Sequence, residues 1–593
     1  MLDIWTDKMK RLAQCSSTPE MVYHGPNAPD VEPMTDAHFE DDPGGNPYTE
    51  ISDSLPLIEL EKMTVDQRIW YDIVDEHLSR RLSGDLPPQL LMICSGEGGV
   101  GKSRTIQTIT QNFKSRKVEH ILVKAAYTGI AASNIAGKTI HRIAMLSVRG
   151  GRHSLETKRK LRLFWRDLEY LIIDEMSMVS KELLAKLSRI IAEAKGKPDE
   201  LFGGVNVCLC GDIHQFPPVV GSTSSPLYWP INPGKDTGDV LLGGRIYENF
   251  PLGLQLRTQC RTSDPVWQNV LQHVRYGTCR QPHLDTLRSM ILSSPDCPAI
   301  DFSQAPWDDA VLITPRHSVR KRWNSEMCKR ECQRKGVPLF RFRAEDTMGG
   351  KRLTARQKTT AKPSKRRKER EEKGGLPDVL EVFVGMKVMV TFNVAVELDV
   401  ANGSRGEVVD IVLDPREDLT IPSSGVVEPR YPPTYVLIRL LHTKVQGLQG
   451  LPDNVLPLVP ISRSFIVNDP VLGKKTAKRK QLPLTAAYAL TDYRGQGQTL
   501  YPVVIDIGRT PTGSLTPFNA YVALSRGRSR DSIRLLRDFE DKMFTVHASE
   551  FLRQEDMRLH HLDEQTRSAW EKKKGGPISG TSLNCRLKSN HRF

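Results

Sequence analysis

The sequence predicts an α/β protein with two parallel-sheet domains, the second of which is split by a small β-rich insertion. Short apolar runs that end in polar turns alternate with helix-compatible stretches, as in a parallel sheet covered by helices. A glycine-rich segment at residues 96–103 joins one such run to a helix. A second α/β pattern begins near residue 250, breaks off, and resumes near residue 483. At 593 residues the chain is too long for one hydrophobic core.

Residues 1–60 are rich in Pro, Asp, Gly and Ser and predict a flexible N-terminal arm. Residues 61–248 predict the first α/β domain. Apolar side chains between Leu183 and Ala194 recur at three- and four-residue intervals, as they do in a helix that covers a sheet. The predicted strands of this domain are Leu90–Cys94, Ile121–Ala125, Tyr170–Ile173 and Val205–Leu209.

The second domain is predicted in two parts, residues 249–350 and 483–540. The first part has a strand at Ala310–Ile313 and a charged helix at Ser318–Arg334. The last part has the apolar runs Leu484–Leu490, Pro502–Ile507 and Ser532–Leu536. Between them we expect a basic disordered insert at 351–378 and a β insertion at 379–482, with strands within Val379–Phe392, Gly406–Val412 and Tyr435–Leu440. Residues 541–593 predict a charged C-terminal tail.

Charge, cysteine content and hydropathy narrow the class of protein. The formal net charge is +14, but Lys351–Lys373 holds eleven Lys or Arg against three Glu, so the rest of the chain is only mildly basic. This charge suggests an anionic partner without deciding for nucleic acid. No apolar run is long enough to cross a bilayer, and the ten cysteines include no C-x-x-C pair. We therefore expect no membrane partner and a reducing compartment.

The glycine-rich segment carries the clearest chemical signal. It consists of Gly96, Glu97, Gly98, Gly99, Val100, Gly101, Lys102 and Ser103. In such a loop the glycines let backbone N–H groups turn inward around a phosphate chain, while the lysine reaches the terminal phosphates and the hydroxyl ligates Mg²⁺. We therefore expect this P-loop to bind a nucleoside triphosphate, with Lys102 on the phosphates and Ser103 on Mg²⁺.

Two polar loops follow later strands of the same domain. Asp174 and Glu175 end the run that starts at Tyr170, at the sheet edge where open α/β sheets bind ligands. We expect Asp174 to hold Mg²⁺ and Glu175 to orient and deprotonate an attacking water. The next strand leads into Gly211–Pro218, where the amide of Gln215 is placed to sense the γ-phosphate.

Read in order, these motifs resemble a known family. Four further segments extend the series: Thr128–Ala132, Thr139–His141, Leu490–Thr499 and Tyr521–Arg528. From about Met63 to Phe539 the order and spacing resemble the petite-integration-frequency (PIF) helicases. These are ATP-dependent DNA helicases of superfamily one and include the helicase portion of Helitron transposons. The resemblance implies two RecA-like domains and an SH3-like β insertion, whose entry resembles Val384–Val390 with Asn402–Gly406.

The resemblance also implies roles for single residues. Gln67 corresponds to the glutamine that reads the adenine of ATP. Arg261 and Arg526 correspond to two arginines that the second domain presents to the γ-phosphate. An arginine donated across a cleft stabilises transition-state charge only when the cleft closes, so it couples hydrolysis to domain motion. The expected catalytic residues are therefore Lys102, Glu175, Gln215, Arg261 and Arg526.

Five residues resemble the single-strand contacts of the family, namely Thr128, Gly129, His141, Gln498 and Thr499. Hydroxyls and backbone amides at such positions grip phosphates without reading bases. The chain departs from the family at Arg494-Gly495, where Lys-Ser is usual, and this puts one DNA contact in question.

The implied function is Mg²⁺- and ATP-dependent unwinding of forked DNA by movement along one strand, in the 5′-to-3′ direction. The implied setting is DNA repair, recombination or telomere maintenance in the nucleus, with the mitochondrion as the alternative. Two rival functions stay open at this point. One is an RNA or hybrid helicase, and the other is a transposon-derived protein that binds nucleic acid without cycling.

Overall fold

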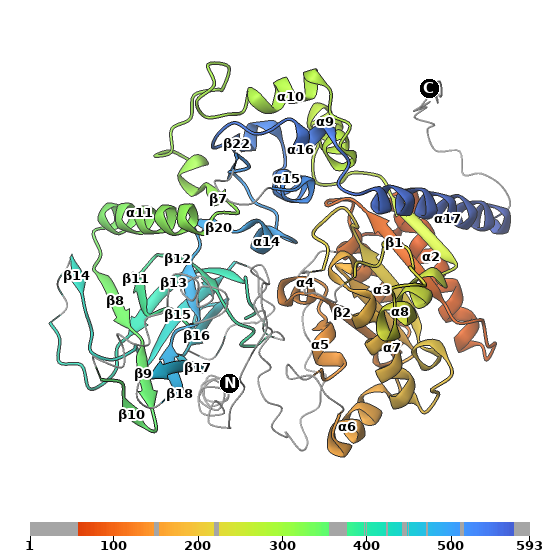
Figure 1. Cartoon of the computed structure of the whole chain (residues 1–593), viewed down its shortest axis with the longest axis horizontal. Helices are drawn as coiled ribbons and strands as arrows, with labels where there is room; N and C mark the ends of the chain where they lie inside the picture. The colour runs from red at the N-terminus through yellow and green to blue at the C-terminus, as the bar shows by residue number, and fades with distance from the viewer. Residues whose placement is uncertain are drawn as a thin grey trace.

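The computed structural model describes most of residues 57–574. The described ranges are 57–146, 153–218, 225–354, 376–395, 400–420, 425–441, 450–469, 473–509 and 515–574, with the single residues 398, 422 and 448. They form two parallel-sheet domains and a β-rich body, which lie right, top and left in Figure 1. The predicted N-terminal arm (to residue 56), the basic insert between 355 and 375, and the tail from residue 575 lie outside the described residues.

The first domain is built on a six-stranded sheet in the order β3-β2-β4-β5-β1-β6, and every neighbouring pair is parallel. The strands are β1 (Leu91–Gly96), β2 (Leu122–Ala126), β3 (Lys138–Thr139), β4 (Tyr170–Asp174), β5 (Asn206–Gly211) and β6 (Leu252–Leu256). The helices are α2 (Val65–Leu82), α3 (Lys102–Ser115), α4 (Gly129–Asn134), α5 (Ile140–Ile143), α6 (Leu155–Trp165), α7 (Lys181–Lys195) and α8 (Gly238–Glu248). This arrangement confirms the predicted α/β class.

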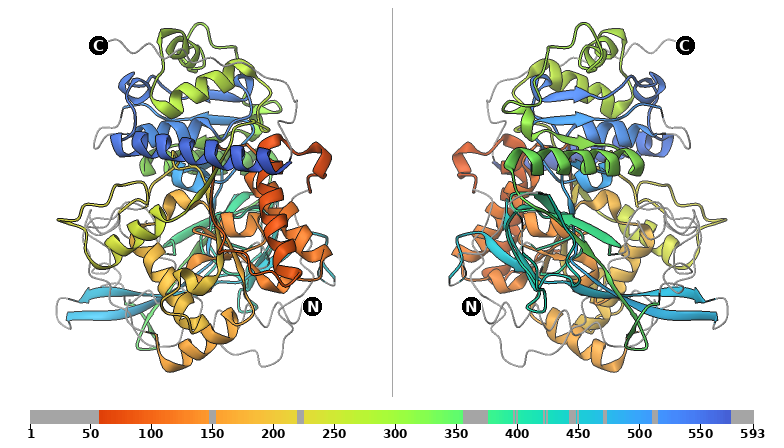
Figure 2. Two further views of the ribbon diagram at one scale, coloured as in Figure 1. Left: turned by 90° about the vertical axis from the view of Figure 1, so that its right-hand side faces the viewer. Right: turned by 90° about the vertical axis from the view of Figure 1, so that its left-hand side faces the viewer.

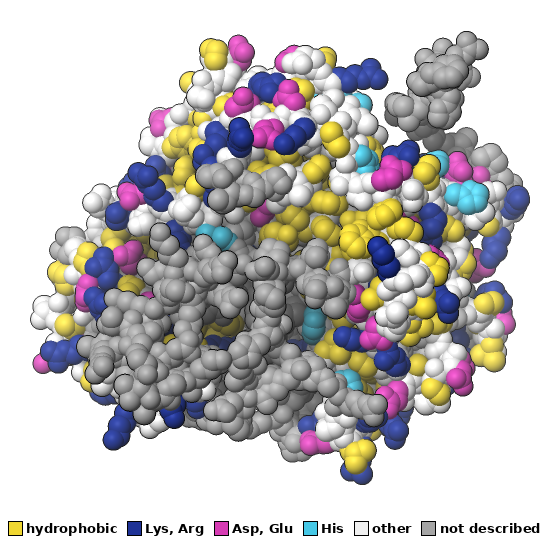
Figure 3. Space-filling view, viewed as in Figure 1, with side chains coloured by type: hydrophobic (Ala, Val, Ile, Leu, Met, Phe, Trp, Pro, Cys, Tyr) yellow, Lys and Arg dark blue, Asp and Glu magenta, His cyan; other side chains and the backbone are white. Residues whose placement is uncertain are grey.

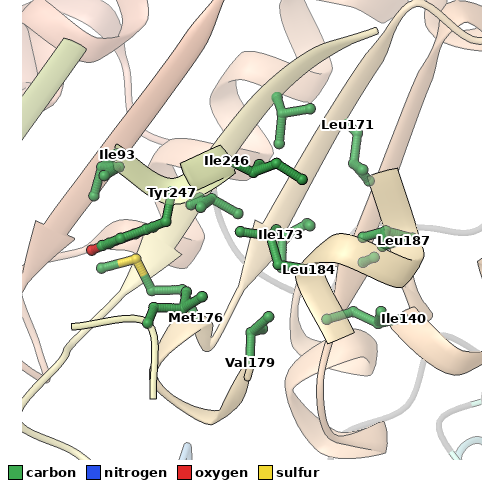
Figure 4. Packing of buried hydrophobic residues seen from close by; sticks show 14 of the residues in the cluster. Ile93, Ile140, Leu171, Ile173, Met176, Val179, Leu184, Leu187, Ile246 and Tyr247 are labelled. Atoms are coloured by element: carbon green, nitrogen blue, oxygen red, sulfur yellow. The ribbon is translucent and has the colours of Figure 1, made fainter. Parts of the chain in front are cut away.

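Alternate side chains of the central strands enter two different cores. Ile93, Leu171 and Ile173 pack with α7 and α8 on one face, in the cluster that Figure 4 shows. Met92, Ile172 and their neighbours pack with α2 and α3 on the other face. Because both faces of the sheet are covered, its strands are continuously apolar. The layer of helices on each side fixes the strand ends, and these ends carry the functional loops.

The first sheet extends beyond the boundary predicted at residue 248. β6 pairs with β1 in parallel register, with Met92 opposite Leu252. The predicted tail also returns to this domain, since α17 (Glu550–Lys574) packs along β6 and α2 (Figure 1). Residues 249–256 and 550–574 therefore belong to the first domain. Pairing between strands distant in sequence decided the boundary, and no local pattern reports such pairing.

The second domain has a four-stranded parallel sheet in the order β20-β7-β21-β22. The strands are β7 (Val311–Ile313), β20 (Ala489–Leu490), β21 (Val503–Ile505) and β22 (Ile533–Leu535). The helices are α9 (Pro265–Tyr276), α10 (Gln281–Arg288), α11 (His317–Lys335), α14 (Asp492–Gly495), α15 (Pro517–Leu524) and α16 (Lys542–Thr545). Val311, Ile313 and Val503 face α9 and α15, whereas Leu312 and Val504 pack near α11.

The β-rich insertion is larger than the predicted 379–482. Its strands are β8 (Leu339–Arg343), β9 (Glu345–Met348), β10 (Lys351–Arg352), β11 (Val379–Val382), β12 (Lys387–Val390), β13 (Arg405–Val412), β14 (Val426–Val427), β15 (Tyr435–Leu440), β16 (Val455–Leu458), β17 (Ile461–Asp469), β18 (Gly473–Gln481) and β19 (Leu484–Ala486). They form three sheets, and the β17–β18 hairpin projects from the body (Figure 2).

Two predicted boundaries of the insertion change with this pairing. β8 pairs with β11, so residues 339–348 belong to the insertion and not to the second domain. The start of the predicted basic insert, Lys351–Arg352, is a strand paired with β9. At the other end, the predicted run Leu484–Leu490 divides between two sheets, because β19 pairs with β12 and β20 pairs with β7. The SH3-like character of this insertion stays a prediction.

Candidate functional site

The P-loop lies where predicted, between β1 and α3. Gly99 and Gly101 have φ angles of 102° and 83°, which L side chains rarely adopt, and Gly101 caps the N-terminus of α3. The Lys102 ammonium donates hydrogen bonds to the carbonyl oxygens of Gly96 (2.8 Å) and Glu97 (2.9 Å). Burial lowers the pKa of Lys102, while Asp212, Asp174 and Glu175 oppose that shift. The Lys102 ammonium therefore interacts electrostatically with three acidic side chains.

The two carboxylates predicted at the end of β4 face this lysine. The Ser103 hydroxyl lies 3.4 Å from Oδ2 of Asp174, which ends β4. Glu175 follows in a left-handed conformation, with φ 57° and ψ 45°. Burial raises the pKa of Glu175, and the neighbouring Asp174 raises it further. Burial also raises the pKa of Asp174, although Lys102 counteracts it. Hydroxyl and carboxylate oxygens at this spacing are the ligands that Mg²⁺ prefers, so these residues fit a Mg²⁺ ion.

Side chains from three different parts of the chain converge on Gly98 of the P-loop. A Cβ atom placed on Gly98 would lie 3.1 Å from Nη2 of Arg526, 3.4 Å from Nη1 of Arg261 and 3.7 Å from Nε2 of Gln215. Arg526 follows α15 of the second domain, and Gln215 follows β5 of the first domain. The predicted catalytic residues therefore surround one loop at the junction of the two domains.

The two arginines are held by different contacts. Arg526 is only 1% exposed, and its guanidinium donates to the Val522 carbonyl (2.9 Å) and the Ser525 hydroxyl (2.7 Å). Arg261 donates to the Ser525 carbonyl at 2.7 Å. Burial lowers the pKa of Arg526, and burial together with Arg526 lowers the pKa of Arg261 to about 9. Two like charges held side by side, one of them fully buried, would be stabilised by an anion bound between them.

Arg261 differs from its predicted position in one respect. It lies between β6 of the first sheet and α9 of the second domain, and so belongs to the segment that connects the domains. The neighbouring Cys260 N–H donates to the Gly99 carbonyl at 2.9 Å, and the Gln259 amide donates to the Gly98 carbonyl at 3.1 Å. This connecting segment therefore lies directly against the P-loop.

Gln67 also contacts the P-loop. Its side-chain NH₂ group donates to the Val100 carbonyl at 3.0 Å, and its amide oxygen accepts from the Thr64 N–H at 3.1 Å. The second contact completes a capping box at the start of α2. The amide plane of Gln67 is thus fixed beside the loop, and its role as the residue that reads adenine stays a prediction.

Two contacts between the domains involve residues that the sequence did not single out. Gln496 donates to Oε2 of Glu175 at 2.9 Å, and so joins α14 of the second domain to the first. Gln496 lies inside the quoted 490–499 motif, so a signal for it existed. On α9, Arg275 forms a buried ion pair with Asp212, whose Oδ2 also accepts from the Tyr521 hydroxyl at 2.8 Å. No sequence signal marks Arg275.

The predicted DNA contacts border the same junction, and Arg526 donates to the Gln498 carbonyl at 3.3 Å. The Thr128 hydroxyl caps α4 by accepting from the Ala131 N–H at 3.2 Å. A Cβ on Gly129 would lie 2.4 Å from Oδ1 of Asn393, and a Cβ on Gly403 would lie 4.0 Å from Nε2 of Gln498. Asn393 and Gly403 belong to the β insertion. The first domain, the insertion and the second domain therefore meet at Thr128, Gly129 and Gln498.

The other two predicted DNA contacts, His141 and Thr499, have different surroundings. The ring of His141 packs edge-on against Tyr127, with centroids 5.8 Å apart, and burial lowers the pKa of His141. Its Nδ1 is buried and has no hydrogen-bond partner among the described residues. Thr499 is exposed. On the face shown in Figure 3, Lys and Arg side chains are mixed with acidic ones, which agrees with a mildly basic body.

Comparison with known proteins agrees with the sequence motifs. Residues 62–232 match the family described as PIF1-like helicase. The ATP-dependent DNA helicase PIF1 of Homo sapiens is 25% identical over 453 residues, which cover 75% of this chain and 58% of that protein. The chain thus spans less than two thirds of the length of this curated relative.

Two solved structures share the fold. The Pif1 helicase from Candida albicans superposes with a TM-score of 0.58 at 23% identity, covering 82% of this chain and 98% of that chain. The Pif1 helicase from Bacteroides, solved with ADP-AlF3 and ssDNA, gives a TM-score of 0.54 at 20% identity, covering 82% and 97%. The two-domain architecture with its inserted β body is therefore one that Pif1 helicases also have.

Proposed function

We propose that this chain, a PIF1-like protein by the match of residues 62–232, is an ATP-dependent DNA helicase that moves along single-stranded DNA. The observation that carries the proposal is the convergence of Arg526, Arg261 and Gln215 on Gly98. A protein that only binds nucleotide needs the P-loop. A motor also needs groups from a second body that stabilise the transition state when the cleft closes.

The side chains divide the chemistry of hydrolysis among them. Lys102 and the P-loop amides bind the phosphates, and Arg261 and Arg526 stabilise charge that develops on the transferred group. Glu175 accepts a proton from the attacking water, and the raised pKa of its carboxylate makes it a stronger base. Gln496 orients that carboxylate through its 2.9 Å hydrogen bond. The orientation of the Glu175 carboxylate therefore depends on the position of the second domain.

The nucleotide is proposed to be ATP with Mg²⁺, held by the Ser103 hydroxyl and the Asp174 carboxylate. When bound, Mg²⁺ supplies charge neutralisation between phosphate oxygens. The curated relative is named an ATP-dependent DNA helicase, and the Bacteroides structure contains ADP-AlF3 with ssDNA. Both findings support this assignment.

The DNA strand is proposed to pass the junction formed by Thr128, Gly129 and Gln498, with His141 and Thr499 farther along. This junction joins all three bodies, so domain motion at the ATP site would change the grip on the strand. Contacts made by hydroxyls and amides to phosphates carry no sequence information. We therefore expect little sequence preference. With DNA as the substrate, the proposed compartment is the nucleus, with the mitochondrion as the alternative, and the proposed setting is DNA repair, recombination or telomere maintenance.

A strand-displacement assay tests this function. Duplexes with a 5′ or a 3′ single-stranded tail, each made in DNA and in RNA, are incubated with the full chain and ATP. We expect unwinding of the 5′-tailed DNA duplex, loss of unwinding without ATP, and little activity on the 3′-tailed duplex. Preferred unwinding of RNA would favour an RNA helicase. ATP-independent binding without hydrolysis on any substrate would favour a non-cycling binding protein.

A further inference from the structure

A second cluster of ligand-type side chains lies outside the ATP site. His214 comes from the loop after β5, His547 from the segment between α16 and α17, and Asp556 from α17. Nε2 of His214 lies 2.9 Å and 3.0 Å from the two carboxylate oxygens of Asp556. Nε2 of His547 lies 3.7 Å from Oδ2 of Asp556. One ligand atom from each residue lies within 4.8 Å of the others.

We propose that His214, His547 and Asp556 bind one divalent transition-metal ion of the Zn²⁺ type. Two imidazoles and a carboxylate are a donor set that such ions prefer over Mg²⁺. Tetrahedral bonds of about 2.0–2.1 Å place ligand atoms roughly 3.3 Å apart. The separations of Asp556 from His214 (2.9 Å) and from His547 (3.7 Å) are close to this value, and the two imidazoles lie within 4.8 Å and would have to move together. This site is separate from the phosphate site, and the proposal does not depend on the helicase activity.

The hydrogen bonding of His547 prepares it as a ligand. Its Nδ1 lies 2.8 Å from the Ser549 carbonyl oxygen and 3.3 Å from the Ser549 N, so either tautomer has a partner there. In the Nδ1–H tautomer the ring donates to the carbonyl and leaves a lone pair on Nε2. That Nε2 atom is buried and has no hydrogen-bond partner among the described residues. Metal-binding histidines commonly donate their other ring N–H to a carbonyl in this way, which fixes the ring and the tautomer.

His214 is the buried member of the cluster. It is 2% exposed, and its Nδ1 also has no hydrogen-bond partner in the described part of the chain. Its Nε2 faces the Asp556 carboxylate, so this nitrogen is the ring atom placed to coordinate an ion. The charge of Arg275 does not exclude a cation, since Arg275 is paired with Asp212.

A surface cavity gives access to the cluster. It has a volume of 520 Å³, and its lining includes His547 and Asp556 together with Gln255, Tyr276 and His560. His214 is not part of this lining, and the centroid of its ring lies 5.2 Å from that of Tyr276, which is. The cavity therefore borders two of the three ligand residues, and a small movement of the His547 ring would open its Nε2 to an entering cation.

Metal binding would connect two moving parts of the protein. His214 is next to Gln215, the residue expected to sense the γ-phosphate, and Asp556 lies on α17, which packs on β6. His547 lies two residues after the end of α16, a helix of the second domain. A bound ion would thus fix the sensor loop to the C-terminal helix and limit the separation of the two domains.

Metal uptake by the full chain tests the proposal. Chelator-treated protein without nucleotide is titrated with Co²⁺, whose visible absorption reports tetrahedral coordination, and Zn²⁺ content is measured after dialysis. We expect about one ion per chain and a higher midpoint of thermal unfolding with Zn²⁺. His547→Ala and Asp556→Ala should lose more than the roughly 10- to 100-fold in affinity that an outer-shell change costs.

Two variants locate the site. His560→Ala removes an exposed histidine of the same cavity and should leave uptake unchanged, and Asp174→Asn alters the phosphate site and should also retain the Co²⁺ spectrum. Circular dichroism of His547→Ala checks that the chain is folded. The proposal is overturned if the wild type takes up no more ion than folded His547→Ala, or if His560→Ala or Asp174→Asn abolishes uptake as completely.

Discussion

Glu175 shows how the backbone places a reactive group. A left-handed conformation costs a non-glycine residue about 1–2 kcal/mol. The conformation persists because Asp174 accepts from the Glu175 N–H at 2.9 Å and Gln496 donates to its carboxylate. The turn aims the carboxylate at the P-loop, where burial and Asp174 raise its pKa. Strain is thus found at the residue expected to handle the water.

We predict that Glu175→Gln keeps ATP binding and loses turnover. The amide preserves the shape of the side chain and cannot accept a proton, so the steady-state ATPase rate should fall by roughly 10²- to 10⁴-fold. Nucleotide affinity, measured with a fluorescent ATP analogue, should change little. Glu248→Gln, at an exposed position on α8, is the control. A wild-type rate in Glu175→Gln would show that another group activates the water.

Lys102→Ala should abolish hydrolysis for a different reason. Its ammonium donates to two carbonyl oxygens of the P-loop and is the cation expected to reach the terminal phosphates. Its removal should lower the rate by at least roughly 10²- to 10³-fold and should also weaken ATP binding. Lys114→Ala, near the end of the same helix, should behave as wild type. Retention of ATP affinity and rate in Lys102→Ala would exclude the P-loop as the nucleotide site.

At the residue scale, motifs predicted most of the cluster around Gly98. Lys102, Glu175 and Gln215 follow strands in recognisable patterns, and their chemistry indicates their roles. Arg275 and Asp212 could not be paired in advance, because 63 residues and a domain boundary separate them. Whether a lone arginine is solvated or buried depends on what packs over it.

Among the helices and strands, α17 has a role that the sequence did not predict. It covers the outer edge of β6, where backbone N–H groups would otherwise lack partners. Asp563 accepts from the Gln255 N–H at 2.8 Å, and Thr566 accepts from the Gly253 N–H at 3.2 Å. The approach is close, since a Cβ on Gly253 would lie 2.6 Å from Cβ of Leu562. The sequence predicted only a charged tail here, because no local pattern reveals which strand a helix covers.

We predict that Asp563→Ala destabilises the docking of α17. Asp563 is fully buried and pairs with Arg257 and Arg567, so its loss removes one acceptor from each guanidinium group and the acceptor of the Gln255 N–H. Arg567 keeps its contacts with Asp66 and the Gln255 carbonyl. The cost should be about 3 kcal/mol in the free energy of unfolding. Chemical denaturation and limited proteolysis within 550–574 measure it. Glu564→Ala changes an exposed neighbour on the same helix and should have little effect; equal stability of the two variants would contradict this account.

Over the whole molecule, the two parallel sheets and the insertion meet at one junction. The nucleotide residues gather around Gly98 and the predicted strand contacts around Gly129, and the contact between Arg526 and the Gln498 carbonyl joins the two groups. The sequence predicted two sheets and an insertion because apolar runs and turns are local signals. It placed the boundaries at 248, 350 and 482 incorrectly, since the pairing of β6, β8 and β19 depends on contacts between distant residues.

The central claim is that ATP is hydrolysed by groups from both domains together. The maximal rate of DNA-stimulated ATP hydrolysis in Arg526→Ala tests it most directly, with exposed Arg528→Ala as the matched control. We predict a loss of roughly 10³-fold or more in the maximal rate of Arg526→Ala, a small change in ATP affinity, and a near wild-type rate in the control. An unchanged maximal rate with only a raised Michaelis constant would contradict the claim and leave Arg526 as a binding residue.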